Sequence, residues 1–162
     1  RFEYEKGCDF VEPLMRLLER TRARFVWIGA KPDCAFAAYC EARLGANPRV
    51  HVLGRQVEYR RWLAAVDGMA FVSREDCFPL VAVEAAAMGK PMVTFASGGV
   101  VELVAETAVP IVADWSLTAM AEAMRRVMDD PAARQAATAV SRGQLFSFER
   151  LRLDWVRYWR AA

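Results

Sequence analysis

The chain has 162 residues, a formal net charge of +2 and 55% hydrophobic residues, a size that suits one folded domain. So small a charge gives no reason to expect a nucleic-acid partner. No run of about eighteen apolar residues is present to span a bilayer, and the first residues are polar and charged, unlike those of a signal peptide. We therefore expect a soluble protein.

Five short apolar runs predict five β-strands. The runs are nearly continuous rather than alternating, as in strands that are covered on both faces. The segments between them are long enough for the crossover that a parallel strand pair needs. The predicted strands are residues 25–28, 50–53, 69–72, 92–95 and 109–112.

Apolar residues at helical spacing predict helices around these strands. Residues 9–22 form the first, because Phe10, Leu14, Leu17 and Leu18 fall on one face. Ser116 is a good N-cap for a later helix, and Pro131 starts another. The other apolar sets are Tyr59, Trp62, Leu63 and Val66; Leu117, Met120, Met124, Val127 and Met128; and Leu151, Trp155, Tyr158 and Trp159.

The alternation of strands and helices predicts the α/β class, with a Rossmann-like, doubly wound parallel sheet. No linker or repeat divides the chain, so residues 1–162 are expected to form one domain. Residues 1–7 are too charged for the central buried strand that commonly comes first in such a sheet. We therefore expect the sheet to lack its first strand and the chain to be cut just after it.

The cysteine and histidine residues do not suggest a metal or nucleophilic site. Four cysteines form no CxxC pair, which argues against zinc binding and thioredoxin-like chemistry. The only histidine, His51, lies in a predicted strand and is best interpreted as a core or strand-edge residue. A hydrolase triad and a catalytic thiol at Cys77 both lack a histidine in a suitable place.

Residues 71–90, FVSREDCFPLVAVEAAAMGK, are the most informative segment. A helix is predicted to begin near Leu80, with Pro79 in its first turn, where a missing backbone donor costs little. A helix N-terminus at the carboxyl end of a strand offers free N–H groups and a positive dipole, which together bind anions. Because Asp76 and Glu84 flank this site, a phosphorylated ligand with sugar hydroxyls is favoured.

Several further motifs lie before and after this segment. They are Arg1-x4-Lys6-Gly7, Gly29, Gly54, Gly89-Lys90-Pro91 and Ser97-Gly98-Gly99-Val100-Val101-Glu102. Taken together, these motifs resemble the carboxyl-terminal domain of the family 4 glycosyltransferases over essentially the whole chain. The resemblance implies a GT-B type fold that binds the nucleotide-sugar donor, while a separate amino-terminal domain binds the acceptor. It therefore also implies that residues 1–162 are a fragment of a larger, two-domain enzyme.

The resemblance also implies roles for individual residues. Arg1 and Lys6 match the basic pair that grips the diphosphate. Asp76 matches the acid that contacts the transferred sugar, and Glu84 the acid that receives the ribose hydroxyls. The remaining matches are Phe78, Pro79, Leu80 and Val81, whose backbone holds phosphate or sugar oxygens, and Gly54 and Arg55, which lie beside the nucleobase.

Residues 75–79, which we call the acidic loop, depart from the family pattern. The family usually has Glu-Gly-Phe-Gly here, whereas this chain has Asp76, with Cys77 and Pro79 in place of the two glycines. Asp is one methylene shorter than Glu, and Pro79 cannot donate a backbone hydrogen bond. Glu75 therefore either substitutes for Asp76 or supports it.

The expected activity is transfer of a glycosyl group from a UDP- or GDP-sugar to a saccharide or lipid-linked acceptor, with the retention of configuration that the resemblance implies. No Asp-x-Asp metal motif occurs, so no metal or other cofactor is expected. The isolated fragment is expected to be inactive, and the full enzyme cytoplasmic, with peripheral membrane association as an open alternative. The other functions left open are a GT-B sugar-nucleotide epimerase or hydrolase, and a non-catalytic nucleotide-sugar-binding module.

Overall fold

The computed structural model describes residues 1–105 and 108–138. All five predicted strands form, and the helices alternate with them along the chain. The predicted aromatic helix at residues 151–159 lies outside the described residues. The elements are a 3-10 turn (Tyr4–Lys6), α1 (Cys8–Leu17), β1 (Phe25–Ile28), α2 (Ala35–Gly45), β2 (Val50–Gly54), α3 (Tyr59–Ala65), β3 (Met69–Phe71), α4 (Leu80–Ala87), β4 (Met92–Phe95), α5 (Val100–Val104), β5 (Ile111–Val112), α6 (Leu117–Asp129) and α7 (Pro131–Ala136).

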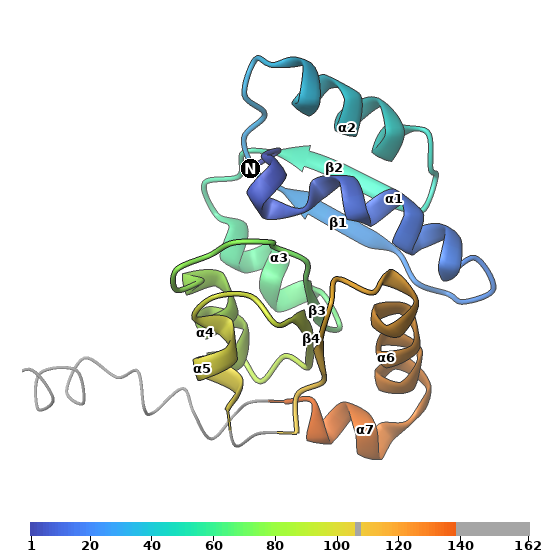
Figure 1. Ribbon diagram of the computed structural model, residues 1–162, viewed down its shortest axis with the longest axis vertical. Helices are drawn as coiled ribbons and strands as arrows, with labels where there is room; N and C mark the ends of the chain where they lie inside the picture. The colour runs from blue at the N-terminus through green and yellow to red at the C-terminus, as the bar shows by residue number, and fades with distance from the viewer. Residues whose placement is uncertain (106–107, 139–162) are drawn as a thin grey trace, which may run out of the picture.

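The strands form two parallel sheets rather than one continuous sheet. β1 pairs with β2 in the first sheet, and the second sheet has the order β3-β4-β5. Figure 1 shows the first sheet with α1 and α2 in one half of the molecule, and the second sheet with α3 to α7 in the other half. Among the described residues, no strand joins β1 to β3. The parallel α/β class is confirmed. We call the break between the β1-β2 sheet and the β3-β4-β5 sheet the split.

The interior explains why helices cover both faces of the second sheet. Side chains alternate along a strand, so the two faces of β4 contact different helices. Val93 and Phe95 belong to a core that also includes α1, α2 and α6. Met92 belongs to a second core with Ala82, Ala85 and Ala86 of α4, which are fully buried. Because these alanines are small, α4 packs close to the sheet.

The helix ends follow the expected capping chemistry. The Ser116 side chain accepts a hydrogen bond from the Ala119 N–H at the start of α6, and Asp130 caps α7 in the same way through Ala132. Gly89 follows α4 with a left-handed φ of 65°, where glycine is strongly favoured. The longest described helix, α6, has 13 residues, and no helix in residues 1–105 or 108–138 is long and apolar enough to cross a membrane.

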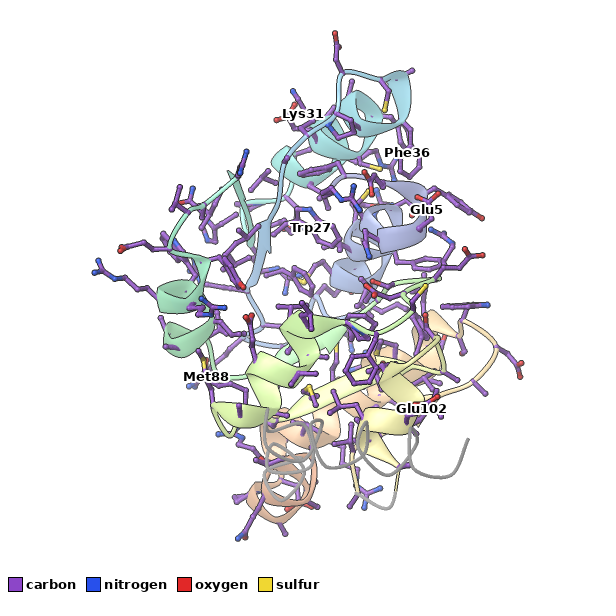
Figure 2. The ribbon with its side chains drawn as sticks, turned by 90° about the vertical axis from the view of Figure 1, so that its left-hand side faces the viewer. Glu5, Trp27, Lys31, Phe36, Met88 and Glu102 are labelled. Carbon is purple, nitrogen blue, oxygen red and sulfur yellow. The ribbon has the colours of Figure 1, made fainter. Side chains whose placement is uncertain are left out.

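Among the described strands, β4 is the most buried and the one that pairs on both edges. All four residues of β4 are buried, whereas β1, β2, β3 and β5 each contain only one buried residue. Figure 2 shows Trp27 of β1 pointing into the interior, while Glu5 lies at the surface. Strands covered on both faces were predicted at all five positions, and this is correct for β4 but wrong for the other four strands. Their exposure fits strands that each lack a neighbour on one edge.

Candidate active site

Three chain segments meet where the first sheet ends. The N–H of Gly29, just after β1, donates to the Gly54 carbonyl at 2.9 Å, and the Phe2 N–H donates to the Ala30 carbonyl at 3.1 Å. A Cβ at Gly29 would overlap the backbone nitrogen of Arg1, so only glycine permits this approach. The start of the chain therefore lies at the carboxyl ends of β1 and β2, as Figure 1 shows. In open α/β sheets, this edge is where ligands bind.

Lys6 and Asp76 are in direct contact at this edge. Lys6 Nζ lies 2.6 Å from Asp76 Oδ2, and their side chains are 26% and 18% exposed. The two residues come from different loops, one before α1 and one after β3. The structure therefore brings together one predicted cation and one predicted acid, which neutralise each other in the absence of ligand.

Arg74 fixes the acidic loop to the start of the chain, a role that the sequence did not reveal. Its guanidinium donates to both carboxylate oxygens of Asp9, at 2.8 and 2.7 Å, and lies 3.9 and 3.8 Å from the ring centres of Tyr4 and Phe10. The N–H groups of Arg74 and Glu75 both donate to the Glu5 carbonyl. Such bidentate and stacked contacts suit arginine and not lysine, and they position the loop that carries Asp76.

A glycine turn supports the acidic loop from the neighbouring strand. Gly98 has a φ of 50°, and a Cβ at this position would overlap the Asp76 carbonyl oxygen. The Gly99 N–H donates to the carbonyls of Asp76 and Cys77, at 3.2 and 3.1 Å. The positive φ of Gly98 lies in the left-handed region that favours glycine. A Cβ at either position would overlap the backbone of the acidic loop, so both positions require glycine.

The N-terminus of α4 opens beside this loop. Pro79 is the N-cap, with no capping side chain, and its carbonyl accepts from the N–H groups of Ala82 and Val83. The first N–H groups of a helix have no intrahelical partner, so those of Leu80 and Val81 remain for a ligand. Their side chains are 71% and 37% exposed. The structure confirms the predicted helix start and gives α4 the geometry of an anion site.

Glu84 lies in the second turn of α4, facing α3. Its Oε1 accepts hydrogen bonds from Tyr59 Oη at 2.8 Å and from Arg60 Nε and Nη2 at 3.1 and 2.7 Å. Sequence spacing assigned Tyr59 to an apolar stripe, together with Trp62, which is 41% exposed. Spacing alone identifies a helix face but cannot show that a hydroxyl on that face reaches a carboxylate on the next helix.

The other predicted site residues have surroundings of their own. The Arg1 side chain is 63% exposed and pairs with Glu3 at 3.1 Å. Arg55 is exposed beside Gly54, and Phe78 is half-buried with its ring near Gly99. Glu75 lines an open hollow of about 530 Å³, whose lining residues are Tyr4, Glu5, Phe10, Arg74, Glu75 and Trp115.

The arrangement combines groups suited to different parts of one ligand. Lys6 and the N–H groups at the start of α4 suit an anion, and they act by charge and by helix dipole. Glu84 and Asp76 are acceptors, suited to hydroxyl donors. A ligand that joins an anionic group to sugar hydroxyls would use both kinds of group at once.

Comparison with known proteins identifies the class of molecule that carries this site. Residues 1–130 match the family described as group 1 glycosyl transferases, and the chain belongs to this family. The structure has the GT-B glycosyltransferase fold: it superposes with a TM-score of 0.81 on sucrose-phosphate synthase from Thermosynechococcus elongatus, at 25% identity, covering 99% of this chain and 43% of that one.

Sequence relatives agree with this assignment. The chain is 33% identical to a glycogen synthase of Mycobacterium tuberculosis over 153 residues, which cover 91% of this chain and 37% of the relative. It is 38% identical over 117 residues to a D-inositol 3-phosphate glycosyltransferase of Nocardioides sp., which cover 65% of this chain and 24% of the relative. The chain thus spans well under half the length of these relatives.

The chain is also similar to a solved structure that contains bound ligands. The Anabaena protein HepE in complex with UDP and glucose superposes with a TM-score of 0.72, at 26% identity, covering 93% of this chain and 42% of that one.

Proposed function

We propose that this chain is the donor-binding domain of a glycosyltransferase that uses a UDP- or GDP-sugar. The observation that carries the proposal is the contact between Lys6 and Asp76 beside the N-terminus of α4, with Glu84 one turn into the same helix. Family membership and the UDP in the Anabaena relative support it. The chemistry of the site independently favours a diphosphate linked to sugars.

In this proposal, the bond between the anomeric carbon and the diphosphate oxygen breaks, and a bond to an acceptor hydroxyl oxygen forms with retention of configuration. Negative charge grows on the departing diphosphate, so groups that face it lower the barrier. Lys6 and the N–H groups of Phe78, Leu80 and Val81 serve this purpose, with Arg1 as a further cation. Pro79, which has no N–H, contributes only by starting the helix.

The two acids have separate roles in the proposal. Asp76 contacts the transferred sugar, because it already lies at Lys6, where the sugar joins the diphosphate. Glu75 lines the neighbouring hollow, which favours Asp76 over Glu75 for this contact. Glu84 receives the ribose hydroxyls, and Gly54 and Arg55 lie beside the nucleobase. Lys6, Arg1 and the helix dipole stabilise the leaving group without a metal ion.

We further propose that a second domain supplies the saccharide or lipid-linked acceptor and that an additional strand pairs between β1 and β3. The split between the two sheets supports this arrangement. All four cysteines, each in the described part of the chain, are free thiols. Free thiols are usual in a reducing compartment, which supports a cytoplasmic location.

Thermal denaturation with a panel of nucleotides tests donor binding. A ligand at a hundred times its Kd stabilises the folded state by about 2.7 kcal/mol, which raises Tm by about 5–10 °C in a domain of this size. We expect UDP or GDP, and the matching sugar nucleotide, to raise Tm, and ADP to have a smaller effect. The absence of a shift with every nucleotide would contradict the proposal. Product analysis of the complete protein, with and without acceptor, then separates transfer from hydrolysis or epimerisation.

A further inference from the structure

The Glu84 carboxylate is held by two consecutive residues at the start of α3. Tyr59 Oη donates to Oε1 at 2.8 Å, and the Arg60 guanidinium donates to the same oxygen through Nε and Nη2. All three hydrogen bonds end on one oxygen, although a carboxylate has about four acceptor sites shared between two oxygens. Oε1 is therefore fully occupied by the protein.

The second oxygen of Glu84 has the opposite environment. Oε2 is buried, and no described residue donates a hydrogen bond to it. A buried polar atom without a partner is rare, because it has lost its bonds to water without replacement. The Glu84 side chain is only 19% exposed, so the orphaned oxygen belongs to an enclosed group rather than a loose surface one. An arriving hydroxyl donor would restore the missing bond.

We propose that Tyr59 and Arg60 position Glu84 so that Oε2 is the acceptor for a ribose hydroxyl of the nucleotide. This inference rests on the proposed function, since it takes the donor to be a nucleotide. By occupying Oε1 completely, the two residues fix the orientation of the carboxylate before the ligand arrives, which lowers the entropic cost of binding.

Tyr59 and Arg60 differ in freedom of movement. The Arg60 side chain is 65% exposed, so it can shift to admit the ligand. Tyr59 is half-buried, and its hydrogen bond to Glu84 raises the pKa of the phenol above its ordinary value, so the hydroxyl stays protonated and donating at neutral pH. Tyr59 is thus the fixed part of the pair, and Arg60 the adjustable part.

Selectivity for ribose hydroxyls separates a positioning role from a structural one. A merely structural link between α3 and α4 would change affinity for all nucleotides alike. A positioning role would change only the gain in affinity that the ribose hydroxyls provide. Calorimetric titration of the chain with UDP and with 2′,3′-dideoxy-UDP measures this benefit as a ratio of two Kd values; if GDP binds better, GDP and its dideoxy analogue replace them.

We expect the wild-type protein to prefer UDP over dideoxy-UDP by about tenfold, as one good hydrogen bond predicts. Tyr59→Phe and Arg60→Gln should each remove most of this preference and leave the Kd of dideoxy-UDP within about twofold. Arg61→Gln removes the same charge from the same helix, but Arg61 pairs with Glu58. Tyr39→Phe removes a hydroxyl from α2. Both control variants should retain the wild-type preference.

Two results would overturn the inference. One is an unchanged preference in both Tyr59→Phe and Arg60→Gln, and the other is an equal loss of affinity for the two nucleotides. A preference that persists in Glu84→Gln would also overturn it, because the hydroxyls would then be recognised elsewhere. If the wild-type protein binds no nucleotide at all, the proposed function fails instead.

Discussion

The ion pair between Lys6 and Asp76 makes two candidate site residues depend on each other. Sequence motifs identified both residues, because each belongs to a short local pattern. Their contact could not be predicted, since it joins positions 70 apart through two loops that only the tertiary fold brings together. In the ligand-free protein each group satisfies the other, so a ligand must compete for Lys6 while it gains Asp76 as an acceptor.

Substitutions at these two residues should therefore have opposite effects on the bare nucleoside diphosphate. Lys6→Ala should weaken its binding about tenfold or more, because hydrogen bonds to charged groups contribute about 1.5–3 kcal/mol. Asp76→Asn should leave that binding equal or tighter, since Lys6 is released, and should weaken only the preference for the sugar nucleotide. Calorimetric titration measures both effects.

Lys31→Ala is a suitable control, because Lys31 forms an exposed pair with Glu41. It should bind the nucleoside diphosphate like wild type. Equal binding by Lys6→Ala and wild type would remove Lys6 from the site, and a large loss in Asp76→Asn would show that Asp76 supports the diphosphate itself.

The strands and helices around the site could be predicted from the sequence better than the side-chain contacts could. Periodicity predicted all five strands and the start of α4, because buried strands and caps leave local signals. The first helix ends at Leu17, five residues before the predicted residue 22, because an apolar stripe marks a face better than an end. Contacts such as those of Arg74 with Asp9 and Tyr4 depend on which loops meet, and no local signal encodes them.

The turn at Gly98 tests how closely the elements must pack. Gly98→Ala introduces a Cβ at a positive φ and against the Asp76 carbonyl, so the free energy of unfolding should fall by about 2 kcal/mol. Displacement of the acidic loop should also weaken nucleoside diphosphate binding. Gly45→Ala is the matched control, because no atom lies within 4 Å of its Cβ position. Urea unfolding should show no loss for Gly45→Ala, and equal stability of the two variants would contradict the packing described.

Glu12 joins α1 to α2 and gives this pair of helices a predictable pH dependence. Burial favours a higher pKa for the Glu12 carboxyl, but hydrogen bonds from Arg43 and Arg16 outweigh burial and lower it. A carboxyl with a lowered pKa in the folded state stabilises the protein above its unfolded pKa, near 4.5, and this stability is lost as the pH falls through the folded pKa.

Glu12→Gln should therefore lower the free energy of unfolding at pH 7 by about 1 kcal/mol, a modest value because the arginines stay partly exposed. The difference from wild type should shrink as the pH falls below about 4. Glu19→Gln, at an exposed acid beyond α1, should match wild type throughout. Chemical denaturation at a series of pH values measures this. A difference that stays constant with pH would rule out the proposed charge linkage.

In the molecule as a whole, the elements of the candidate site lie at one edge, where the parallel strands of both sheets end. The acidic loop after β3, the glycine ends of β1 and β2, and the start of α4 all lie where parallel strands end. The α/β class and this edge could be predicted from the order of strands and helices. The separation into two sheets could not be read from apolar runs, which report burial along each strand but not which strands pair.

We propose that this edge binds the diphosphate and ribose of a nucleotide-sugar donor. A crystal structure of the chain with UDP or GDP at saturating concentration is the most direct test. We expect the diphosphate at Lys6 Nζ and the N–H groups of Leu80 and Val81, with a ribose hydroxyl at Glu84. A nucleotide bound elsewhere on the molecule, or none bound at a concentration that saturates it in solution, would contradict this proposal.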